Sequence, residues 1–320
     1  MIAFECKICQ NSKNNLSYNV KEMMFGMQQS FEYIQCANCG CLQLKNEPQN
    51  ISDYYPKEQY YSFATSTLSP IQQQLKYYIL GKLFNYYIGH FSIVGYLASG
   101  FYYLEKKYNW VKCLKGLSKS SNILDIGSGS GKYLDELFAS GFKNIQGIDP
   151  YLEKDLKTTK GLLIAKQELA AITGTYDFIM LNHVFEHMNA PQEILSKIHA
   201  LLNTKGKLLI RIPIVDSYAW EAYGVNWYQI DAPRHFYLHT KKSMELLAQK
   251  TGFSIEAITY DSNDYQFIFS EQYAQHKTMK APQHFTQAQI KKWRKKSKVL
   301  NATGQGDQAC FILKPTTCYE

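Results

Sequence analysis

Residues 122–151 read NILDIGSGSGKYLDELFASGFKNIQGIDPY and decide the fold that this sequence predicts. An apolar run at 123–126 leads into glycines at every second position, and a segment with helical spacing of apolar residues follows. Gly141 marks the end of that helix, and a second apolar run, 145–148, ends on Asp149. This order of strand, tight turn, helix, strand and acid is typical of one half of a nucleotide-binding α/β unit.

The glycines and the two acids of this stretch have separate physical tasks. Gly127 and Gly129 allow a tight turn in which the backbone approaches a ligand closely, and the free N–H groups of the next helix favour an anionic group. Asp149 follows the glycines by about twenty residues, where a carboxylate can bind both ribose hydroxyls. Asp125 precedes the first glycine by two residues, so it is placed to hold the loop or an ammonium group.

The commoner nucleotide-binding motifs do not fit this stretch. A dinucleotide motif requires glycine at position 132, which is Lys, and a P-loop requires glycine at 126 and Ser or Thr at 133, where Ile126 and Tyr133 stand. The pattern D-x-G-x-G-x-G followed by Asp149 instead resembles the first two motifs of class I S-adenosylmethionine (SAM)-dependent methyltransferases. The alternative is a glycine-rich turn in another α/β protein. The resemblance implies that Asp149 holds the ribose and that the loop wraps the methionine end through Asp125, Gly127, Ser128, Gly129 and Gly131.

A second stretch, 176–213, supports the same family. It reads YDFIMLNHVFEHMNAPQEILSKIHALLNTKGKLLIRIP, and its apolar run 178–181 predicts a buried parallel strand. Asn182 and His183 fall at the carboxyl end of that strand, where ligands bind in this kind of sheet, so both are predicted to contact the cofactor. A helix from Pro191 and a fifth strand at 207–213 are expected to follow. This string is similar to the later motifs of the family, and the resemblance then covers nearly all of residues 119–215.

Four cysteines near the N-terminus predict a metal site. Cys6-x-x-Cys9 and Cys36-x-x-Cys39 are separated by 26 residues, and paired C-x-x-C motifs at such a spacing suit tetrahedral zinc. So small a module lacks the core to fold unaided. With four thiolates no position is open for chemistry, so the zinc is predicted to be structural. The alternatives are a zinc-free thiol cluster or redox pair, and Cys41 as a substitute ligand.

The segment that joins the cysteines to the glycine loop is Tyr-rich and then helical. Residues 49–68, with Tyr54-Tyr55 and Tyr60-Tyr61, form either an aromatic lid over the substrate or a packed linker, and we favour the linker. Residues 69–111 have a helical, unusually apolar pattern. A membrane span is disfavoured because Lys82, Asn85, His90 and four glycines interrupt the run. Peripheral membrane contact is a second alternative, and two helices that cover the catalytic domain are the favoured interpretation.

The segment 220–236 contains a Trp/Asp/Pro/Arg/His cluster where this fold usually builds its acceptor pocket. Arg234 can fork onto a carboxylate or phosphate of a substrate, and His235 can accept a proton near neutral pH. His235 is therefore the predicted base, with His187 and Glu186 as further catalytic candidates. Two alternatives stay open here: Asp231 and Arg234 brace a loop while His235 packs, or Glu186 and His187 tie the strand end to the next helix.

The order of elements predicts an α/β fold, a Rossmann-like, seven-stranded methyltransferase sandwich with a small N-terminal zinc-binding module and a helical linker. The late elements are a helix at 241–250 capped by Thr240, a sixth strand at 253–260 and a seventh at 309–313. Predicted domains are a zinc-ribbon-like module (1–48), the connector and helices (49–118) and the methyltransferase domain (119–320) with a helical insertion near 268–307.

Composition limits the partners. The 320-residue chain has a net charge of +8, which permits an anionic substrate but does not require nucleic acid. Without a recognisable signal peptide, a cytoplasmic, reducing location is expected. The cysteine module, the core and the W…DAPRH segment resemble bacterial enzymes of sugar and polysaccharide biosynthesis, including zinc-containing sugar C-methyltransferases. That resemblance implies a small acceptor, a nucleotide-linked or lipid-linked sugar methylated on oxygen or carbon. A zinc-knuckle RNA base methyltransferase and a non-catalytic cofactor-fold protein are the alternatives.

Overall fold

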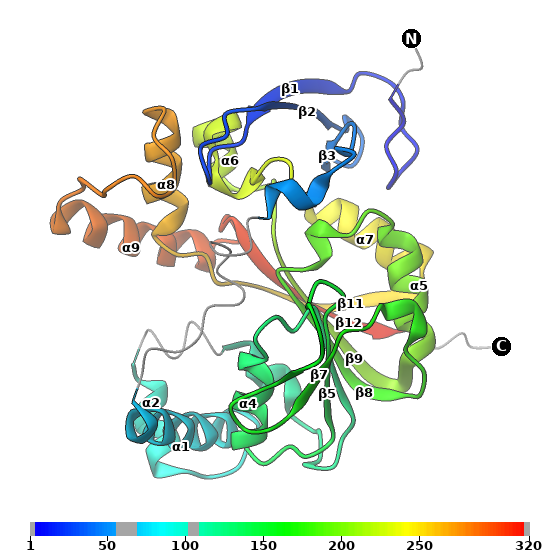
Figure 1. Ribbon diagram of the computed structural model, residues 1–320, viewed down its shortest axis with the longest axis vertical. Coiled ribbons are helices and arrows are strands. Elements are labelled where there is room, and N and C mark those ends of the chain that lie inside the picture. The colour runs from blue at the N-terminus through cyan, green and yellow to red at the C-terminus, as the bar shows by residue number, and fades with distance from the viewer. Residues whose placement is uncertain (1–3, 56–68, 102–108, 317–320) are drawn as a thin grey trace. The chain divides into compact units, whose positions relative to one another are not determined.

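The computed structural model describes residues 4–55, 69–101 and 109–316 of the chain (Figure 1). These residues divide into two compact units. Unit 1 contains residues 1–56, 183–195 and 211–311, and unit 2 contains residues 57–182, 196–210 and 312–320. The part of the Tyr-rich segment that includes Tyr60 and Tyr61 lies outside the described residues, as does Cys318.

The larger sheet has eight strands among the described residues, in the order β11-β12-β9-β8-β4-β5-β7-β6. Its central part is parallel: β4 (Ile123–Ile126) pairs with β5 (Ile145–Ile148) on one side and with β8 (Tyr176–Asn182) on the other, and β5 pairs with β7 (Leu163–Ala165). All four residues of β4 are buried, as expected for a central parallel strand. The α/β fold predicted from residues 122–151 is confirmed, with a mixed sheet.

The sheet differs from the seven strands that we expected. The additional strand, β6 (Leu156–Lys157), is two residues long, exposed, and antiparallel to β7 at the edge of the sheet. So short an exposed segment has no apolar alternation, so the sequence gives no signal for it. The remaining strands are β9 (Leu202–Pro213), β11 (Phe253–Tyr260) and β12 (Gln308–Pro315).

Three helices of unit 2 pack in succession. Helix α4 (Lys132–Ala139) follows the glycine loop, α1 (Pro70–Tyr87) packs against α4, and α2 (Ile93–Ser99) packs against α1 (Figure 1). At Gly81 of α1 an added Cβ would lie 2.6 Å from the Ala139 carbonyl oxygen, so the absence of a side chain allows this close contact. The prediction of two helices in the apolar segment is confirmed. None of the described helices is long and apolar enough to span a membrane.

Unit 1 is built around a four-stranded sheet in the order β1-β2-β3-β10. Strands β1 (Leu16–Lys21), β2 (Ser30–Gln35) and β3 (Leu42–Leu44) come from the cysteine module, and β10 (Tyr237–Leu238) comes directly after the DAPRH segment. All three pairings are antiparallel, and Leu238 of β10 lies opposite Leu42 of β3. The cysteine module and the segment predicted to form the acceptor pocket therefore share one sheet.

The helices after β8 begin with α5 (Pro191–Leu201), which starts at the predicted proline. The later helices belong to unit 1: α6 (Tyr218–Tyr223), α7 (Lys241–Lys250), α8 (Tyr265–Ala274) and α9 (Gln287–Ala302). Thr240 caps α7 as predicted, accepting a hydrogen bond from the N–H of Ser243. Strand β9 begins at Leu202 rather than at the predicted 207, so Gly206 lies within the strand.

Candidate active site

Three glycines give the loop after β4 its shape. Gly127, Gly129 and Gly131 have φ values of 70°, 52° and 74°, a left-handed region that residues with a Cβ adopt at a cost. Gly131 also has no room for a side chain, because an added Cβ would lie 2.4 Å from Thr158 Cγ2. Ser128 fixes the turn from inside, since its hydroxyl donates to the carbonyl of Asp125 at 2.8 Å. The sequence therefore folds here into one defined loop.

Asp149 faces this loop from the end of β5. Its Oδ2 accepts a hydrogen bond from the N–H of Gly129 at 2.9 Å, and its Oδ1 accepts one from the N–H of Tyr151 at 3.0 Å. Burial raises the pKa of Asp149, although the two N–H donors oppose that shift. A carboxylate oxygen can accept more than one hydrogen bond. Asp149 therefore retains acceptor capacity for the two hydroxyls of a ribose at the rim of the loop.

Asp125 lies at the centre of the same region. It is almost completely buried in β4, and burial, with a smaller contribution from the charge of Asp149, raises its pKa to about 8. A carboxyl group with so high a pKa has no cation beside it among the described residues. Such a group is suited to a ligand that brings a positive charge of its own.

Asn182 supplies the third polar group of this region. It follows Leu181, which pairs with Ile126 of β4 at the point where the glycine loop begins. Its side-chain Oδ1 and Nδ2 are both buried, and neither has a hydrogen-bond partner among the described residues. Buried amides without partners are rare in native proteins, and their presence indicates a missing ligand or water. Among the described residues, the donor and the acceptor of the Asn182 amide are thus left unpaired beside the glycine loop, as expected where a polar ligand binds.

The sequence around the glycine loop matches a known family. Residues 102–258 match the family model described as a methyltransferase domain. The protein is a SAM-dependent methyltransferase. The cofactor is therefore SAM, and the contacts of the glycine loop, Asp125 and Asp149 with it stay predictions.

Solved structures of the same kind are similar to this methyltransferase at low sequence identity. A SAM-dependent methyltransferase from Archaeoglobus fulgidus is 18% identical with a TM-score of 0.42, over 67% of this chain and 99% of that chain. A putative SAM-dependent methyltransferase from Listeria monocytogenes is 12% identical with a TM-score of 0.44, over 66% and 98%. The magnesium protoporphyrin IX methyltransferase of Synechocystis PCC 6803 with bound S-adenosylhomocysteine is 11% identical with a TM-score of 0.44, over 84% and 95%. No curated protein matches the chain. Similarity at this level says nothing of the acceptor.

The three predicted catalytic residues come together in unit 1. Glu186 and His187 lie in the short 3₁₀ helix η5 (Phe185–His187), and His235 follows the 3₁₀ helix η7 (Tyr228–Ile230). One ligand atom of each residue lies within 4.8 Å of the others, and the rings of His187 and His235 are 4.6 Å apart at their centroids. We call these three residues the Glu–His–His cluster. His187 and His235 are 48 positions apart in the sequence, and the N–H of Phe236 donates to the carbonyl of Glu186 at 2.8 Å, which joins the two segments.

Charge within the cluster is unevenly distributed. Glu186 is fully buried, and neither of its oxygens meets the geometry of a hydrogen bond among the described residues. Burial alone would raise the pKa of Glu186, but His183, His187 and His235 outweigh it and lower the pKa to about 2. Burial and the neighbouring His235 lower the pKa of His187. The cluster therefore combines an ionised carboxylate with a neutral imidazole at neutral pH.

Hydrogen bonds fix the orientation of both imidazoles. Nδ1 of His235 lies 2.8 Å from the carbonyl oxygen of Gln229, and Nδ1 of His187 lies 2.9 Å from that of Arg234. A carbonyl accepts hydrogen bonds only, so each Nδ1 carries a proton, and in a neutral imidazole Nε2 then has the free lone pair. Nε2 of His235 lies 4.0 Å from Glu186 Oε1 and 3.8 Å from Asp231 Oδ2. A proton taken up at this nitrogen would be flanked by two carboxylates.

Tyr55 belongs to the segment 49–68, for which the sequence favours a packed linker. Its hydroxyl lies 3.1 Å from Nδ1 of His187, so it contacts the Glu–His–His cluster. Its separation from His187 by 132 positions explains why no local pattern indicated it. The only sequence signal was the concentration of tyrosines in 49–68, one reading of which was an aromatic platform near the substrate.

His183 is predicted to contact the cofactor. His183 has a left-handed backbone (φ 55°) at the end of β8, with Nδ1 3.4 Å from Glu186 Oε1 and Nε2 2.9 Å from Arg211 Nη1. Its ring therefore faces the cluster, and a contact with the cofactor stays a prediction for this residue.

The prediction that Arg234 binds substrate needs correction. Its side chain is fully buried, with Nε and Nη2 bonded to Asp231, Nη2 bonded 2.9 Å from Glu22 Oε1, and Nη1 bonded 3.0 Å from the carbonyl oxygen of Tyr54. All three nitrogens of the guanidinium are thus already hydrogen-bonded to acceptors within the protein. The geometry favours the alternative in which Asp231 and Arg234 brace the loop, and it adds Glu22 as an unexpected partner.

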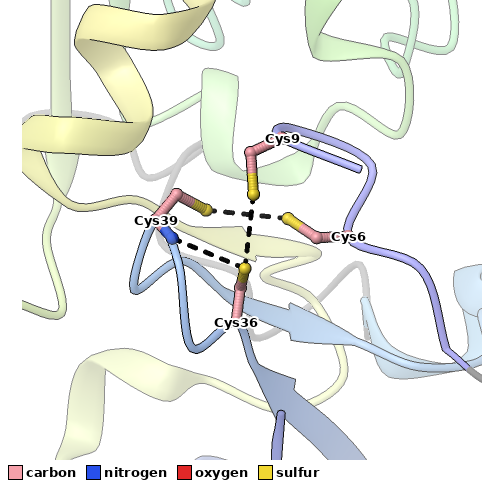
Figure 2. A group of neighbouring side chains, drawn as sticks. All are labelled: Cys6, Cys9, Cys36 and Cys39. Atoms are coloured by element: carbon pink, nitrogen blue, oxygen red, sulfur yellow. Dashed lines mark hydrogen bonds between the residues drawn. The ribbon is translucent and has the colours of Figure 1, made fainter. Parts of the chain in front are cut away.

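The four predicted metal ligands converge in unit 1. Figure 2 shows the sulfur atoms of Cys6 and Cys9, from the N-terminal loop, facing those of Cys36 and Cys39, from the turn after β2. The Cys6–Cys39 and Cys9–Cys36 sulfur pairs are 3.6 Å and 3.4 Å apart, and all four sulfurs lie within 4.8 Å of one another. Cys41 is not part of this group, and its sulfur lies 3.9 Å from Nδ1 of His239.

Proposed function

We propose that this methyltransferase modifies a small, sugar-derived acceptor, nucleotide-linked or lipid-linked, on oxygen or on carbon. The observation that carries this proposal is the Glu–His–His cluster. A hydroxyl or a carbon acid is a poor nucleophile until it loses a proton, so an enzyme that methylates one benefits from a positioned base. An acceptor nitrogen that is unprotonated at neutral pH, such as one in an aromatic ring, would not require such a base, because its lone pair is already available.

His235 is the proposed base. When SAM is bound, it supplies an electrophilic methyl group and a neutral thioether leaving group. Nε2 of His235 would accept the proton that the acceptor atom loses, which would make that atom a nucleophile toward the methyl group. The imidazolium is stabilised by Glu186 and Asp231, whose oxygens lie 4.0 Å and 3.8 Å from Nε2. A base so flanked contributes roughly 10²–10⁴ in rate.

Tyr55 and His187 complete the site in this proposal. The Tyr55 hydroxyl lies 3.1 Å from Nδ1 of His187, so a tyrosine adjoins the Glu–His–His cluster. The tyrosine hydroxyl is a donor suited to a developing enolate or alkoxide oxygen. A hydroxyl donor beside the proposed base would suit a keto-sugar acceptor.

We also propose that Cys6, Cys9, Cys36 and Cys39 bind one structural zinc ion. Sulfur separations of 3.4–3.6 Å suit tetrahedral coordination with zinc–sulfur bonds of about 2.3 Å. The second shell is in place as well, since the Gln43 amide donates to the Cys6 sulfur at 2.9 Å and the Cys39 N–H donates to the Cys36 sulfur at 3.5 Å.

The acceptor is tested by incubating the enzyme with methyl-labelled SAM and a panel of nucleotide-linked sugars, keto-sugars included, polyprenyl-linked sugars and an RNA transcript. Mass analysis should place the label on a sugar. His235→Ala should lower turnover by at least about a hundredfold, whereas His284→Ala, an exposed histidine elsewhere in unit 1, should have no effect. Transfer to RNA alone, or full activity in His235→Ala, would refute the proposal.

The zinc site is tested by metal analysis of the purified protein. We expect one equivalent of zinc in the wild type and none in Cys36→Ser, with Cys310→Ser, at a buried cysteine outside the cluster, as the matched control. Because β3 and β10 share a sheet, Cys36→Ser should also lower turnover while SAM binding in unit 2 persists. Retention of stoichiometric zinc in Cys36→Ser would contradict the ligand set. Two equivalents in the wild type would assign a second ion to the Glu–His–His cluster.

A further inference from the structure

Helices α1 and α2 carry an unusual concentration of exposed apolar side chains. Nine of the eighteen large hydrophobic residues that are exposed in the described chain lie between positions 71 and 101. Phe91 at the turn between the helices is 89% exposed, and Phe101 just after α2 is 67% exposed. Ordinary surface helices expose single apolar residues and not a contiguous group, so this face indicates an interaction surface.

Helix α2 buries its small residues and exposes its large apolar ones, whereas a helix that packs on a protein core normally does the opposite. Its buried residues are Gly95 and Ala98, while Ile93, Tyr96 and Leu97 are 64%, 61% and 62% exposed. Gly95 lies so close to α1 that an added Cβ would be 2.3 Å from the carbonyl oxygen of Lys82. The small residues thus allow α2 to pack tightly on α1, and the large apolar residues are left facing outward. A hydrophobic environment outside the chain would explain this arrangement.

The charges around this surface point to an anionic partner. Between Glu58 and Asp125 the sequence contains seven lysines and one acidic residue, Glu105. Two of the described lysines flank the turn that bears Phe91: Lys115 Cε would lie 3.8 Å from a Cβ at Gly89, and Lys112 Nζ lies 5.1 Å from the Tyr87 ring centroid. Exposed aromatic and aliphatic side chains beside lysines, with almost no carboxylates, match the charge and polarity of an anionic lipid headgroup layer.

We infer that the α1–α2 hairpin docks on the surface of an anionic lipid bilayer, with Phe91 and the outward face of α2 inserted among the headgroups. Since no described helix can span a membrane, the hairpin lies in the interface and does not cross it. The hairpin also precedes residue 102, where the match to the methyltransferase domain begins. The proposed docking surface therefore lies outside the matched domain.

Vesicle sedimentation tests this inference with the full chain. Wild-type protein should sediment with equimolar phosphatidylglycerol–phosphatidylcholine vesicles, more weakly with pure phosphatidylcholine, and less as salt increases. The triple variant Phe91→Ser, Ile93→Ser, Leu97→Ser should lose at least about tenfold in partitioning. The matched control Leu16→Ser, Val299→Ser, which changes residues 57% and 61% exposed elsewhere, should partition as the wild type does.

Calorimetry with SAM shows whether each variant is folded, because the glycine loop lies outside the changed surface. Absence of wild-type binding to the anionic vesicles would overturn the inference, and so would equal losses in the triple variant and the control. Light scattering provides a further arm: a dimer that the triple variant abolishes, without vesicle binding by the wild type, would show that the surface joins two copies of the chain instead.

Discussion

Asp125 shows how burial gives a single residue a pH-dependent function. Burial and, to a smaller extent, the charge of Asp149 raise the pKa of the Asp125 carboxyl group to about 8. An ammonium group placed beside it would favour the ionised form and lower that pKa. Binding of SAM at neutral pH should therefore release a proton, because Asp125 is largely protonated in the free enzyme and ionised in the complex.

This linkage fixes the direction of the pH dependence. As the pH rises from about 6 to about 7.5, SAM should bind more tightly, by up to roughly tenfold per pH unit. Calorimetry in two buffers of different ionisation enthalpy measures both the affinity and the released proton. Asp125→Asn should remove the pH dependence. An affinity that is independent of pH in the wild type, without proton release, would show that Asp125 does not meet the ammonium group.

Arg234 makes a second prediction for a single residue. Removing it by Arg234→Met leaves the buried carboxylates of Glu22 and Asp231 without their cation, which should lower the free energy of unfolding by about 3–5 kcal/mol. Arg294 makes a matched control because its partner is also an aspartate, Asp264 at 2.8 Å, but its own side chain is 60% exposed. Arg294→Met should cost at most about 1 kcal/mol. Equal effects in urea unfolding would contradict the bracing role of Arg234.

Among the elements, the start of α4 is where the fold depends most on one residue type. Gly131 is the N-cap of this helix with φ 74°, and an added Cβ would be 2.4 Å from Thr158 and 2.5 Å from Ile164. Gly131→Ala should therefore combine a left-handed strain of about 1–2 kcal/mol with a steric clash. Gly174→Ala, at φ 91° with nothing within 4 Å, isolates the strain. We expect thermal unfolding to show a larger loss for Gly131→Ala, and similar losses would mean that the loop yields to the side chain.

The elements that could be predicted from the sequence are those with strong local signals. Helix α7 and strand β11 occupy the predicted ranges because a capping Thr240, a helical period and an alternating apolar run are all contiguous in sequence. Strands β3 and β10 were not predicted, because they have three and two residues and pair across the chain. The same reason explains which parts of the site could be predicted. The glycine loop is one contiguous stretch, whereas the Arg234–Glu22 contact joins residues 212 positions apart.

At the scale of the whole molecule, the two units hold different parts of the predicted machinery. Unit 2 contains the glycine loop, Asp149 and Asn182, and unit 1 contains the Glu–His–His cluster and the four cysteines. The chain passes from one to the other between Asn182 and His183. Cofactor binding and activation of the acceptor should therefore be separable by substitution, although a single chain performs both.

Calorimetric titration of SAM into three proteins tests this separation most directly: the wild type, Asp149→Asn and His235→Ala. We predict that Asp149→Asn binds SAM more weakly by about 1.5–3 kcal/mol, which is roughly 10- to 150-fold in Kd. His235→Ala should bind SAM with the affinity of the wild type while its turnover is lost. Unchanged affinity in Asp149→Asn, or a loss of SAM binding in His235→Ala, would contradict the account.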